Sequence, residues 1–413
     1  MRVLLSTIGS RGDVQPLLAL ALELRALGQE ARFCVPPDFQ AWLAGLDFAV
    51  TPIGPELRSM MAAKPSGPPA PMTPEQRKQL AEASVAAQFQ TVAAAAEGCD
   101  AIVAATALQI AARSVAEVRG IPYAFAAYCP NVLPSPHHAP PPLPPIPGMP
   151  VAAPGTNAER WARDGERFDA LFGPSLNAHR ATLGLAPVAD VRAHVFGERP
   201  WLAADRALAP WPDPADDGVF QPGAWIVADE RPLSPEIEAF LAAGAPPIYF
   251  GFGSMRAAPD LNHVMIAAAR ALGRRAIVSR GWAELALLDA AGDCLAIDEA
   301  NLQALFARVA AVVHHGGAGT TTIAALAGAP QVVVPQMYDQ HYWAQRIQTL
   351  GIGAAHAPGA PTADSLTSAL ANALKPDVRA GAQSIGRRVR PDGARTAAER
   401  LLAAYEPASE AGV

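Results

Sequence analysis

Short apolar runs alternate with longer amphipathic stretches along both halves of the chain. In the first half, apolar runs of strand length cover residues 2–7, 31–35, 48–52, 101–105 and 123–127. The segments between them are long enough for helices, and this alternation is typical of βαβ units that feed a parallel sheet. After the first run, the pattern predicts a helix that begins near Val14, has Pro16 in its first turn and ends at Gly28.

The second half repeats this scheme, although no short internal repeat is present. Strands are expected over residues 248–252, 276–279, 294–297, 311–314 and 331–334. Helices are expected over residues 261–272, 302–307, 319–327, 340–350 and 363–374, with a last helix over 394–405. The sequence therefore predicts an α/β protein whose two halves share one architecture.

Prolines mark the stretches that interrupt the alternation. The chain has 41 prolines, about twice the usual share, and they gather in residues 64–74, 134–154 and 209–223. The first stretch fits a solvated loop, and the other two are expected to border a cleft between the halves. We therefore place an N-terminal domain at residues 1–208, a linker at 209–230, a C-terminal domain at 231–390 and a final helix and tail at 391–413.

The composition narrows the class of protein. Hydrophobic residues make up 51% and charged residues 17% of the 413 residues, which excludes a disordered chain. The net charge is −6 and no basic block stands out, so neither nucleic acid nor an anionic membrane is an expected partner. The four cysteines are far apart, the first apolar run is too short for a signal peptide, and no apolar stretch could span a bilayer. We expect a soluble cytoplasmic protein.

A glycine-rich turn that includes residues 314–320, His-His-Gly-Gly-Ala-Gly-Thr, lies between a predicted strand and a predicted helix. Such a turn lets backbone N–H groups approach an anion, which the helix dipole also favours. It matches neither a Walker loop nor Gly-x-Gly-x-x-Gly. Adjacent strand residues face opposite ways, so we assign His315 to a phosphate and His314 to the packed interior. The alternative is a tight turn that only permits close packing, with both histidines satisfied locally.

Three other loops follow predicted strands and carry polar groups. Asp339 and Gln340 suit the hydroxyls of a sugar, although Asp339 could instead be the N-cap of a helix. Ser254 could donate to a phosphate oxygen or cap a helix. In the first half, Asp13 could accept a proton from a nucleophilic hydroxyl, or it could cap the helix that begins near Val14.

In this order and at these spacings, the residues resemble the inverting nucleotide-sugar glycosyltransferases of the GT-B fold. The resemblance is strongest to the bacterial antibiotic-tailoring branch typified by vancomycin-group glycosyltransferases. The segments that carry it are residues 10–16, 128–130, 134–138, 201–205, 223–226, 251–255, 279–282, the turn at 314–320, and 339–340.

The resemblance implies two Rossmann-like domains that face a central cleft, with the C-terminal helix crossing back to the first domain. It implies that Asp13 is the general base, that the first domain binds the acceptor, and that no metal is needed. The UDP- or dTDP-sugar is then a co-substrate rather than a cofactor, and its partner is the hydroxyl of a secondary-metabolite aglycone. The residues implied in donor binding are Ser10, Arg11, Gly12, Ser254, Arg280, Trp282, Asn301, Leu302, His315, Gly316, Gly317, Ala318, Gly319, Thr320, Asp339 and Gln340.

Two positions depart from the plant-type signature of the wider family. Ile297 stands where a base-stacking Trp would fall, and Ile323 where a ribose-binding Glu would fall, which leaves UDP and dTDP donors both open. His137 and His138 have no assured role in the resemblance; they lie in an acceptor flap or, as we favour, only punctuate the proline tract. A nucleotide-sugar epimerase of the same fold and a catalytically silent partner of another glycosyltransferase are the alternative functions. The sequence leaves the acceptor and the oligomeric state open.

Overall fold

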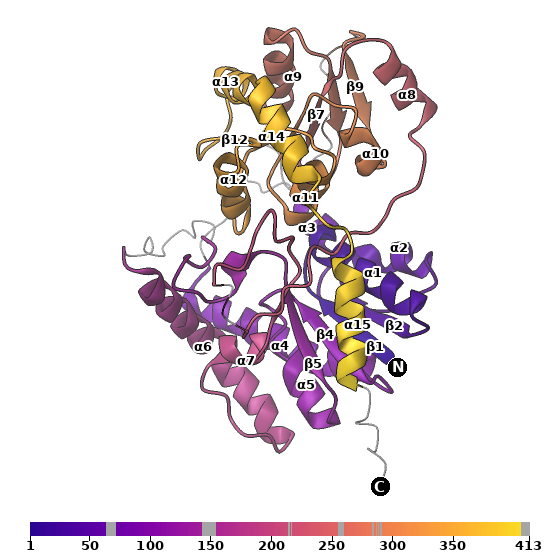
Figure 1. Ribbon diagram of the computed structural model, residues 1–413. Helices are drawn as coiled ribbons and strands as arrows, with labels where there is room; N and C mark the ends of the chain where they lie inside the picture. Colours follow the sequence, from indigo (N-terminus) through magenta and orange to yellow (C-terminus); the bar gives the residue numbers. More distant parts are fainter. Residues whose placement is uncertain are drawn as a thin grey trace.

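Two parallel six-stranded sheets form the framework of the protein (Figure 1). The computed structural model describes residues 1–62, 72–142, 154–213, 215, 217–254, 260–282, 285, 287, 289 and 291–405. The first sheet has the order β3-β2-β1-β4-β5-β6 and the second the order β12-β11-β10-β7-β8-β9. All the strand pairs within these sheets are parallel, which confirms the predicted pair of α/β units.

The strands of both sheets are short and largely buried. In the first sheet they are β1 (Arg2–Thr7), β2 (Glu30–Val35), β3 (Ala49–Pro52), β4 (Ala101–Ala105), β5 (Tyr123–Ala127) and β6 (Trp201–Leu202). In the second they are β7 (Ile248–Gly251), β8 (Ala276–Ser279), β9 (Cys294–Ile297), β10 (Ala311–His314), β11 (Gln331–Val333) and β12 (Gly353–Ala355). Helices on both faces bury these strands, as a parallel sheet requires.

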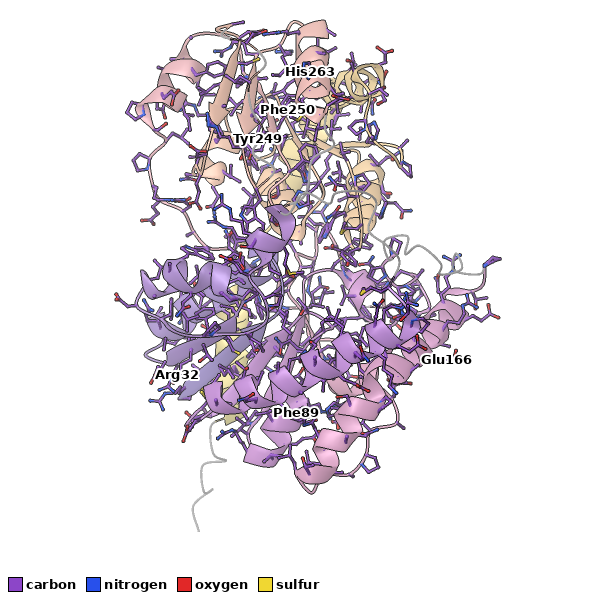
Figure 2. All side chains as sticks on the ribbon, turned by 180° about the vertical axis from the view of Figure 1, so that it is seen from behind. Arg32, Phe89, Glu166, Tyr249, Phe250 and His263 are labelled. Atoms are coloured by element: carbon purple, nitrogen blue, oxygen red, sulfur yellow. The ribbon has the colours of Figure 1, made fainter. Side chains whose placement is uncertain are left out.

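The helices of the first unit are α1 (Arg11–Ala26), α2 (Gln40–Ala44), α3 (Leu57–Ala62), α4 (Pro74–Ala95), α5 (Ala112–Arg119), α6 (Asn157–Thr182) and α7 (Val191–Phe196), with short 3-10 turns η1 (Pro37–Phe39) and η2 (Pro130–Val132). The second unit contains α8 (Pro235–Ala242), α9 (Leu261–Ala271), α10 (Leu302–Phe306), α11 (Ala318–Leu326), α12 (Gln340–Thr349), α13 (Ala363–Ala373) and α14 (Pro376–Gly386). The last helix is α15 (Gly393–Tyr405). Figure 2 shows the layer of α4 and α6, with Phe89 and Glu166 labelled, in front of the first sheet.

Helix α1 begins earlier than the sequence pattern predicted. Ser10 is its N-cap, so the helix starts at Arg11 and not near Val14. Pro16 therefore lies in the second turn, where it removes one backbone hydrogen bond, and the expectation that it sits in the first turn is wrong. Asp13 is the third helical residue, so its expected alternative role as the N-cap of this helix is wrong as well.

The chain crosses twice between the two sheets. After β6, residues 209–223 (214 and 216 lie outside the described residues) stay with the first sheet, because Gln221 bonds the Ala204 and Ala209 carbonyls and accepts from the Trp211 N–H. The outgoing and returning segments meet at an antiparallel bridge between Trp225 and Asp392. The domain limits at 208, 230 and 390 stay predictions.

Helix α15 packs on α1 of the first unit, which confirms the predicted return of the C-terminal helix (Figure 1). Its buried Ala397, Ala398 and Leu401 share one apolar cluster with Leu17 and Leu24 of α1. Among the described residues, no helix combines the length and the apolar character needed to cross a membrane.

Candidate active site between the two sheets

The carboxyl ends of the two sheets face each other, and contacts join them on both sides. On one side the Tyr338 N–H, after β11, donates to the Pro142 carbonyl at 3.2 Å. On the other, Arg11 after β1 forms an ion pair with Glu299 after β9. Ligands of open α/β sheets bind in this position, outside the carboxyl ends of the strands. The described part of the proline tract, up to residue 142, contacts the second unit through the bond to Tyr338, and its place beside a cleft stays a prediction. Residues 143–153 and 63–71 lie outside the described residues.

Asp13 lies in the first turn of α1, which follows β1. Its Oδ2 accepts a hydrogen bond from the Ser10 N–H at 2.7 Å, and the Ser10 hydroxyl lies 3.3 Å from the same oxygen. A side chain at Gly9 would collide with this carboxylate. Burial raises the pKa of the Asp13 carboxyl to about 6, because the low-dielectric surroundings disfavour its charged form more than the Ser10 hydrogen bonds favour it. A carboxylate with such a pKa is suited to accept a proton near neutral pH.

Asp339 lies across the cleft at the start of α12. It occupies the N-cap position, but its side chain makes no capping hydrogen bond. Instead its Oδ2 accepts from the Trp343 indole N–H at 3.3 Å. Burial, and after it the negative charge of Asp13, raise the pKa of Asp339 to about 7. The two carboxyl groups therefore interact electrostatically, although they come from different sheets.

Gln340 follows Asp339 and organises the loop after β11. Its Oε1 accepts from the backbone N–H groups of Gln336 at 2.8 Å and Met337 at 3.1 Å. The side chain is buried. The structure thus gives the amide oxygen a role in shaping this loop, next to the residue expected to contact the sugar.

The two histidines at the end of β10 lie in different environments. His314 is fully buried. Its Nδ1 accepts a hydrogen bond from the Gly316 N–H at 3.1 Å, and its Nε2 lies 2.9 Å from Gln331 Oε1. Nδ1 is an acceptor, so Nε2 carries the proton and donates to Gln331. Burial lowers the pKa of His314 to about 3, so the ring is neutral and fixed in one orientation.

His315 is only partly buried and lies between two glycines. A methyl group at Gly253 would be 3.3 Å from its Cε1, and one at Gly317 would be 2.7 Å from its Nε2. Among the described residues, the buried Nδ1 of His315 has no hydrogen-bond partner. Burial lowers the pKa of His315 to about 4, so at neutral pH the ring is an uncharged donor through one nitrogen.

The turn that follows His315 opens directly into α11. Gly316 has a φ of +96°, and a methyl group there would be 2.7 Å from Val333 Cγ1, so both its conformation and its packing favour glycine. Gly317 is the N-cap and has no side chain to satisfy the first helical N–H groups, which belong to Ala318, Gly319 and Thr320. Gly319 is exposed. The start of α11 can therefore receive an anion.

The other residues predicted to bind a donor follow strands of both sheets. Ser254 and Leu302 are half-buried, Gly12 and Arg280 are exposed, and Arg280 lies 3.9 Å from Asp298. Asn301 is buried; its Oδ1 caps α10, and its Nδ2 donates to the carbonyls of Asp229 and Arg231, both at 2.7 Å. These bonds join α10 to the linker and engage both polar atoms of the Asn301 side chain.

Trp282 and Arg11 contact side chains that the sequence analysis did not single out. The Trp282 indole stacks on Phe39 at 6.3 Å, and the Arg11 guanidinium lies 4.8 Å from the Trp42 ring. Phe39, Trp42 and Glu299 all follow strands, β2 or β9, at their carboxyl ends. That position is the only signal in the sequence that could have identified them.

The histidine pair of the proline tract packs within the first unit. His138 Nε2 lies 2.9 Å from the Leu133 carbonyl, and its ring lies against those of Trp161 and Trp211. The His137 N–H donates to the Ser135 hydroxyl at 3.1 Å.

Family models and relatives match both units of the chain. Residues 3–135 match the glycosyltransferase family 28 N-terminal domain. Residues 283–394 match the C-terminal domain of erythromycin biosynthesis protein CIII-like proteins. Glycosyltransferase GtfE of Amycolatopsis orientalis is 51% identical over 98% of both chains, and the vancomycin aglycone glucosyltransferase of the same organism is 49% identical over 97% of both.

Solved structures show the same fold at low sequence identity. The glycotransferase of kitacinnamycin aligns with a TM-score of 0.73 over 97% of this chain and 98% of its own, at 20% identity. The glycosyltransferase VinC in complex with dTDP aligns with a TM-score of 0.69 over 98% and 99%, also at 20% identity. The fold is therefore GT-B, and the chain belongs to the bacterial antibiotic-tailoring glycosyltransferases, in the vancomycin group.

Proposed function

We propose that this glycosyltransferase moves a hexose or deoxysugar from a UDP- or dTDP-sugar to a hydroxyl of a secondary-metabolite aglycone, with inversion at the anomeric carbon. The observation that carries the proposal is the placement of Asp13 on one side of the cleft and of Asp339, near the His315 turn, on the other. A base on one side of a sugar and an anion site on the other are what a single in-line displacement needs.

In the proposed reaction, the acceptor hydroxyl oxygen bonds to the anomeric carbon while Asp13 takes the hydroxyl proton. The bond from that carbon to the diphosphate oxygen breaks, and the diphosphate leaves with the electron pair. The N–H groups at the start of α11 and the neutral His315 ring meet the charge that develops on it. Asp339 accepts hydrogen bonds from sugar hydroxyls. Leaving-group stabilisation is thus assigned to backbone and imidazole donors rather than to a metal.

The domain roles follow from the same arrangement. The second domain would hold the donor through the glycine-rich turn before α11 and through Ser254, Trp282 and Leu302, which follow strands β7, β8 and β9. The first domain would hold the acceptor beside Asp13. The names of two relatives, the vancomycin aglycone glucosyltransferase and the dTDP-epi-vancosaminyltransferase, support vancomycin aglycone as the first acceptor and a dTDP-sugar as the first donor to test. A UDP-sugar is tested beside it.

The experiment that tests this function is calorimetric titration of the protein with UDP, dTDP and their glucose conjugates in the presence of EDTA. We expect binding that survives the chelator, with one base preferred. Transfer from the preferred donor to vancomycin aglycone is then assayed by mass spectrometry of the product. If no nucleotide binds with or without added Mg²⁺, the assignment of the α11 turn to a diphosphate is wrong.

A further inference from the structure

The two domains are in contact on both sides of the cleft. On the side of β11, one backbone hydrogen bond joins Tyr338 to Pro142, and the Arg346 Nε donates to the Leu208 carbonyl at 2.8 Å. Apolar side chains of both domains also share one cluster that includes Trp211 and Trp343. On the side of β8 and β9, an aromatic pair and an ion pair join the domains. We call this second set the clasp; its members are Arg11, Phe39, Trp42, Trp282 and Glu299.

The aromatic part of the clasp is a stacked pair. Phe39 comes from η1 after β2, and only 5% of its surface is exposed. Its ring lies nearly parallel to the Trp282 indole, with 6.3 Å between centroids and 17° between planes. Trp42 contacts Phe39 edge to face at 6.3 Å. Phe39 belongs to the apolar core of the first domain, and Trp282 of the second domain packs against that core.

The polar part of the clasp is an ion pair. Arg11 and Glu299 bond across the cleft, and 43% and 56% of their side-chain surfaces are exposed. The Arg11 guanidinium also lies over Trp42. An exposed ion pair contributes little stability by itself, so the aromatic contact is the stronger part and the ion pair fixes its orientation.

The clasp is connected to both halves of the candidate site. The Trp282 N–H donates to the Gly253 carbonyl at 3.0 Å, and Gly253 lies against the His315 ring. Arg11 stands two residues before Asp13 in the first turn of α1. The clasp therefore fixes two parts of the site relative to each other. One is the turn that would hold the diphosphate, and the other is the helix that carries the candidate base.

We propose that Phe39 and Glu299 are positioning residues that hold the domains closed over the donor, so that the sugar passes to the acceptor rather than to water. This inference rests on the proposed function. In the competing hydrolysis, a water oxygen bonds to the anomeric carbon, and the bond from that carbon to the diphosphate oxygen breaks. The diphosphate leaves with the electron pair, and the water proton passes to Asp13. Closed domains exclude that water.

Two variants and a matched control test the clasp. Phe39→Leu removes the ring but keeps an apolar side chain, and Glu299→Gln removes the charge at nearly constant shape. The control is Phe48→Leu, because Phe48 is 6% exposed and packs on Phe33 at 5.2 Å within the first domain. Phe39→Tyr, which keeps the ring, is the conservative rescue.

The first readout is the ratio of nucleotide released to glycoside formed, with the preferred nucleotide-glucose and vancomycin aglycone. We expect this ratio to rise several-fold in Phe39→Leu and less in Glu299→Gln. In Phe48→Leu and Phe39→Tyr it should stay at the wild-type value. An unchanged ratio in both clasp variants of a protein that transfers sugar overturns the clasp and leaves the proposed function intact.

The second readout needs no catalysis. Small-angle X-ray scattering of the ligand-free proteins should give a larger radius of gyration for the Phe39→Leu/Glu299→Gln double variant than for the wild type and Phe48→Leu. An equal radius of gyration in all three overturns the clasp. A wild-type protein that neither binds a nucleotide nor transfers sugar would overturn the proposed function, and the scattering would still decide whether these side chains hold the domains together.

Discussion

The Asp13 carboxylate owes its environment to small neighbours. Gly9 has no side chain to displace it, and the Ser10 N–H holds one of its oxygens. Its position after the first strand left Asp13 open between a base and a helix cap, and the family resemblance favoured the base. Its raised pKa could not be predicted, because that depends on burial in the cleft and on the true start of α1.

Replacing Asp13 by Asn should lower kcat by about 10²–10⁴-fold while nucleotide affinity stays near the wild-type value. The Asn side-chain oxygen can still accept from the Ser10 N–H, so the turn should persist and only the base should be lost. Steady-state kinetics and calorimetry on the same preparation give both quantities. A near-normal kcat would exclude Asp13 as the base.

The rate should also depend on pH through this group. The base must be ionised, and its pKa is raised from an ordinary value of 3.8 to about 6, so kcat/KM should fall as the pH drops through about 6. The same raised pKa means that protonation of Asp13 favours the folded state, so this group adds stability as the pH falls below that value. A kcat/KM profile over the acid range measures the first effect. An acid limb near 4 would contradict the burial of the carboxylate in the working enzyme.

The neighbouring histidines should respond differently to the same substitution. His315→Ala should weaken nucleotide binding and leave thermal stability nearly unchanged. His314→Ala should lower stability by about 1–3 kcal/mol, because the Gly316 N–H and the Gln331 side chain lose a buried partner. Calorimetric titration and thermal melts separate the two effects. The control is His263→Ala, because this exposed side chain on α9 lies outside the candidate site (Figure 2). Equal nucleotide affinity in His315→Ala and His263→Ala would remove His315 from the anion site.

At the scale of secondary-structure elements, the central strands were the most predictable part of the fold. The bounds of β1, β4, β5, β8, β9 and β10 agree with the apolar runs. All of these except the edge strand β9 lie inside a sheet, where burial on both faces needs continuous apolar sequence. Helices α4 and α6 were not predicted. Alanine and polar residues give α4 no clear apolar stripe. Helix α6 does bury Trp161, Phe172 and Leu176 at helical spacing, a signal that the sequence analysis missed. Strand β6 has two residues and pairs only with β5 among named strands, which leaves almost no pattern to detect.

Some residues of the candidate site could be predicted from the sequence, and others could not. Loops that follow strands could be identified from their residue types, so Asp13, His315 and Asp339 were found. Side chains that meet the other domain, such as Phe39 and Glu299, carry no sequence signal beyond their position after a strand. Asn301 was predicted to bind the donor, but its side-chain amide donates hydrogen bonds to the Asp229 and Arg231 carbonyls instead.

The start of α15 should tolerate no side chain. A methyl group at Gly393 would collide with the Gly223 carbonyl group, so Gly393→Ala should destabilise the protein by about 1–3 kcal/mol. Gly165→Ala is the matched control, because it lies inside α6 with open space around its Cα. That change should stabilise by about 0.5–1 kcal/mol, since alanine favours a helix over glycine. Chemical denaturation gives the free energy of unfolding of both variants. Equal changes in that free energy would mean that the chain is not close-packed where Gly393 meets Gly223.

At the scale of the whole molecule, α15 packs with the first domain although it follows the second domain in the sequence. Trp225 and Asp392 pair where the two connections cross, and beyond this point the chain returns to α1. Ala397, Ala398 and Leu401 complete the apolar cluster on that side of the first sheet.

Ending the chain after Asp392 should therefore destabilise the first domain selectively. Calorimetry should show a new transition at lower temperature, because α1 loses the apolar face that covers it, while the second domain keeps all its own helices. A chain that ends at Tyr405 is the control, since it keeps α15 entire. A single transition at the wild-type temperature in the shorter chain would contradict a structural role for α15.

The position of α15 in the sequence also sets the order in which the protein can be completed during synthesis. The ribosome makes the first sheet before the second, but the helix that covers α1 emerges only after the whole second domain. Throughout that interval the nascent first domain presents the apolar surface of Leu17 and Leu24 without its final cover. The helices and strands of the second domain, in contrast, are consecutive in the sequence and are all made once α14 is complete.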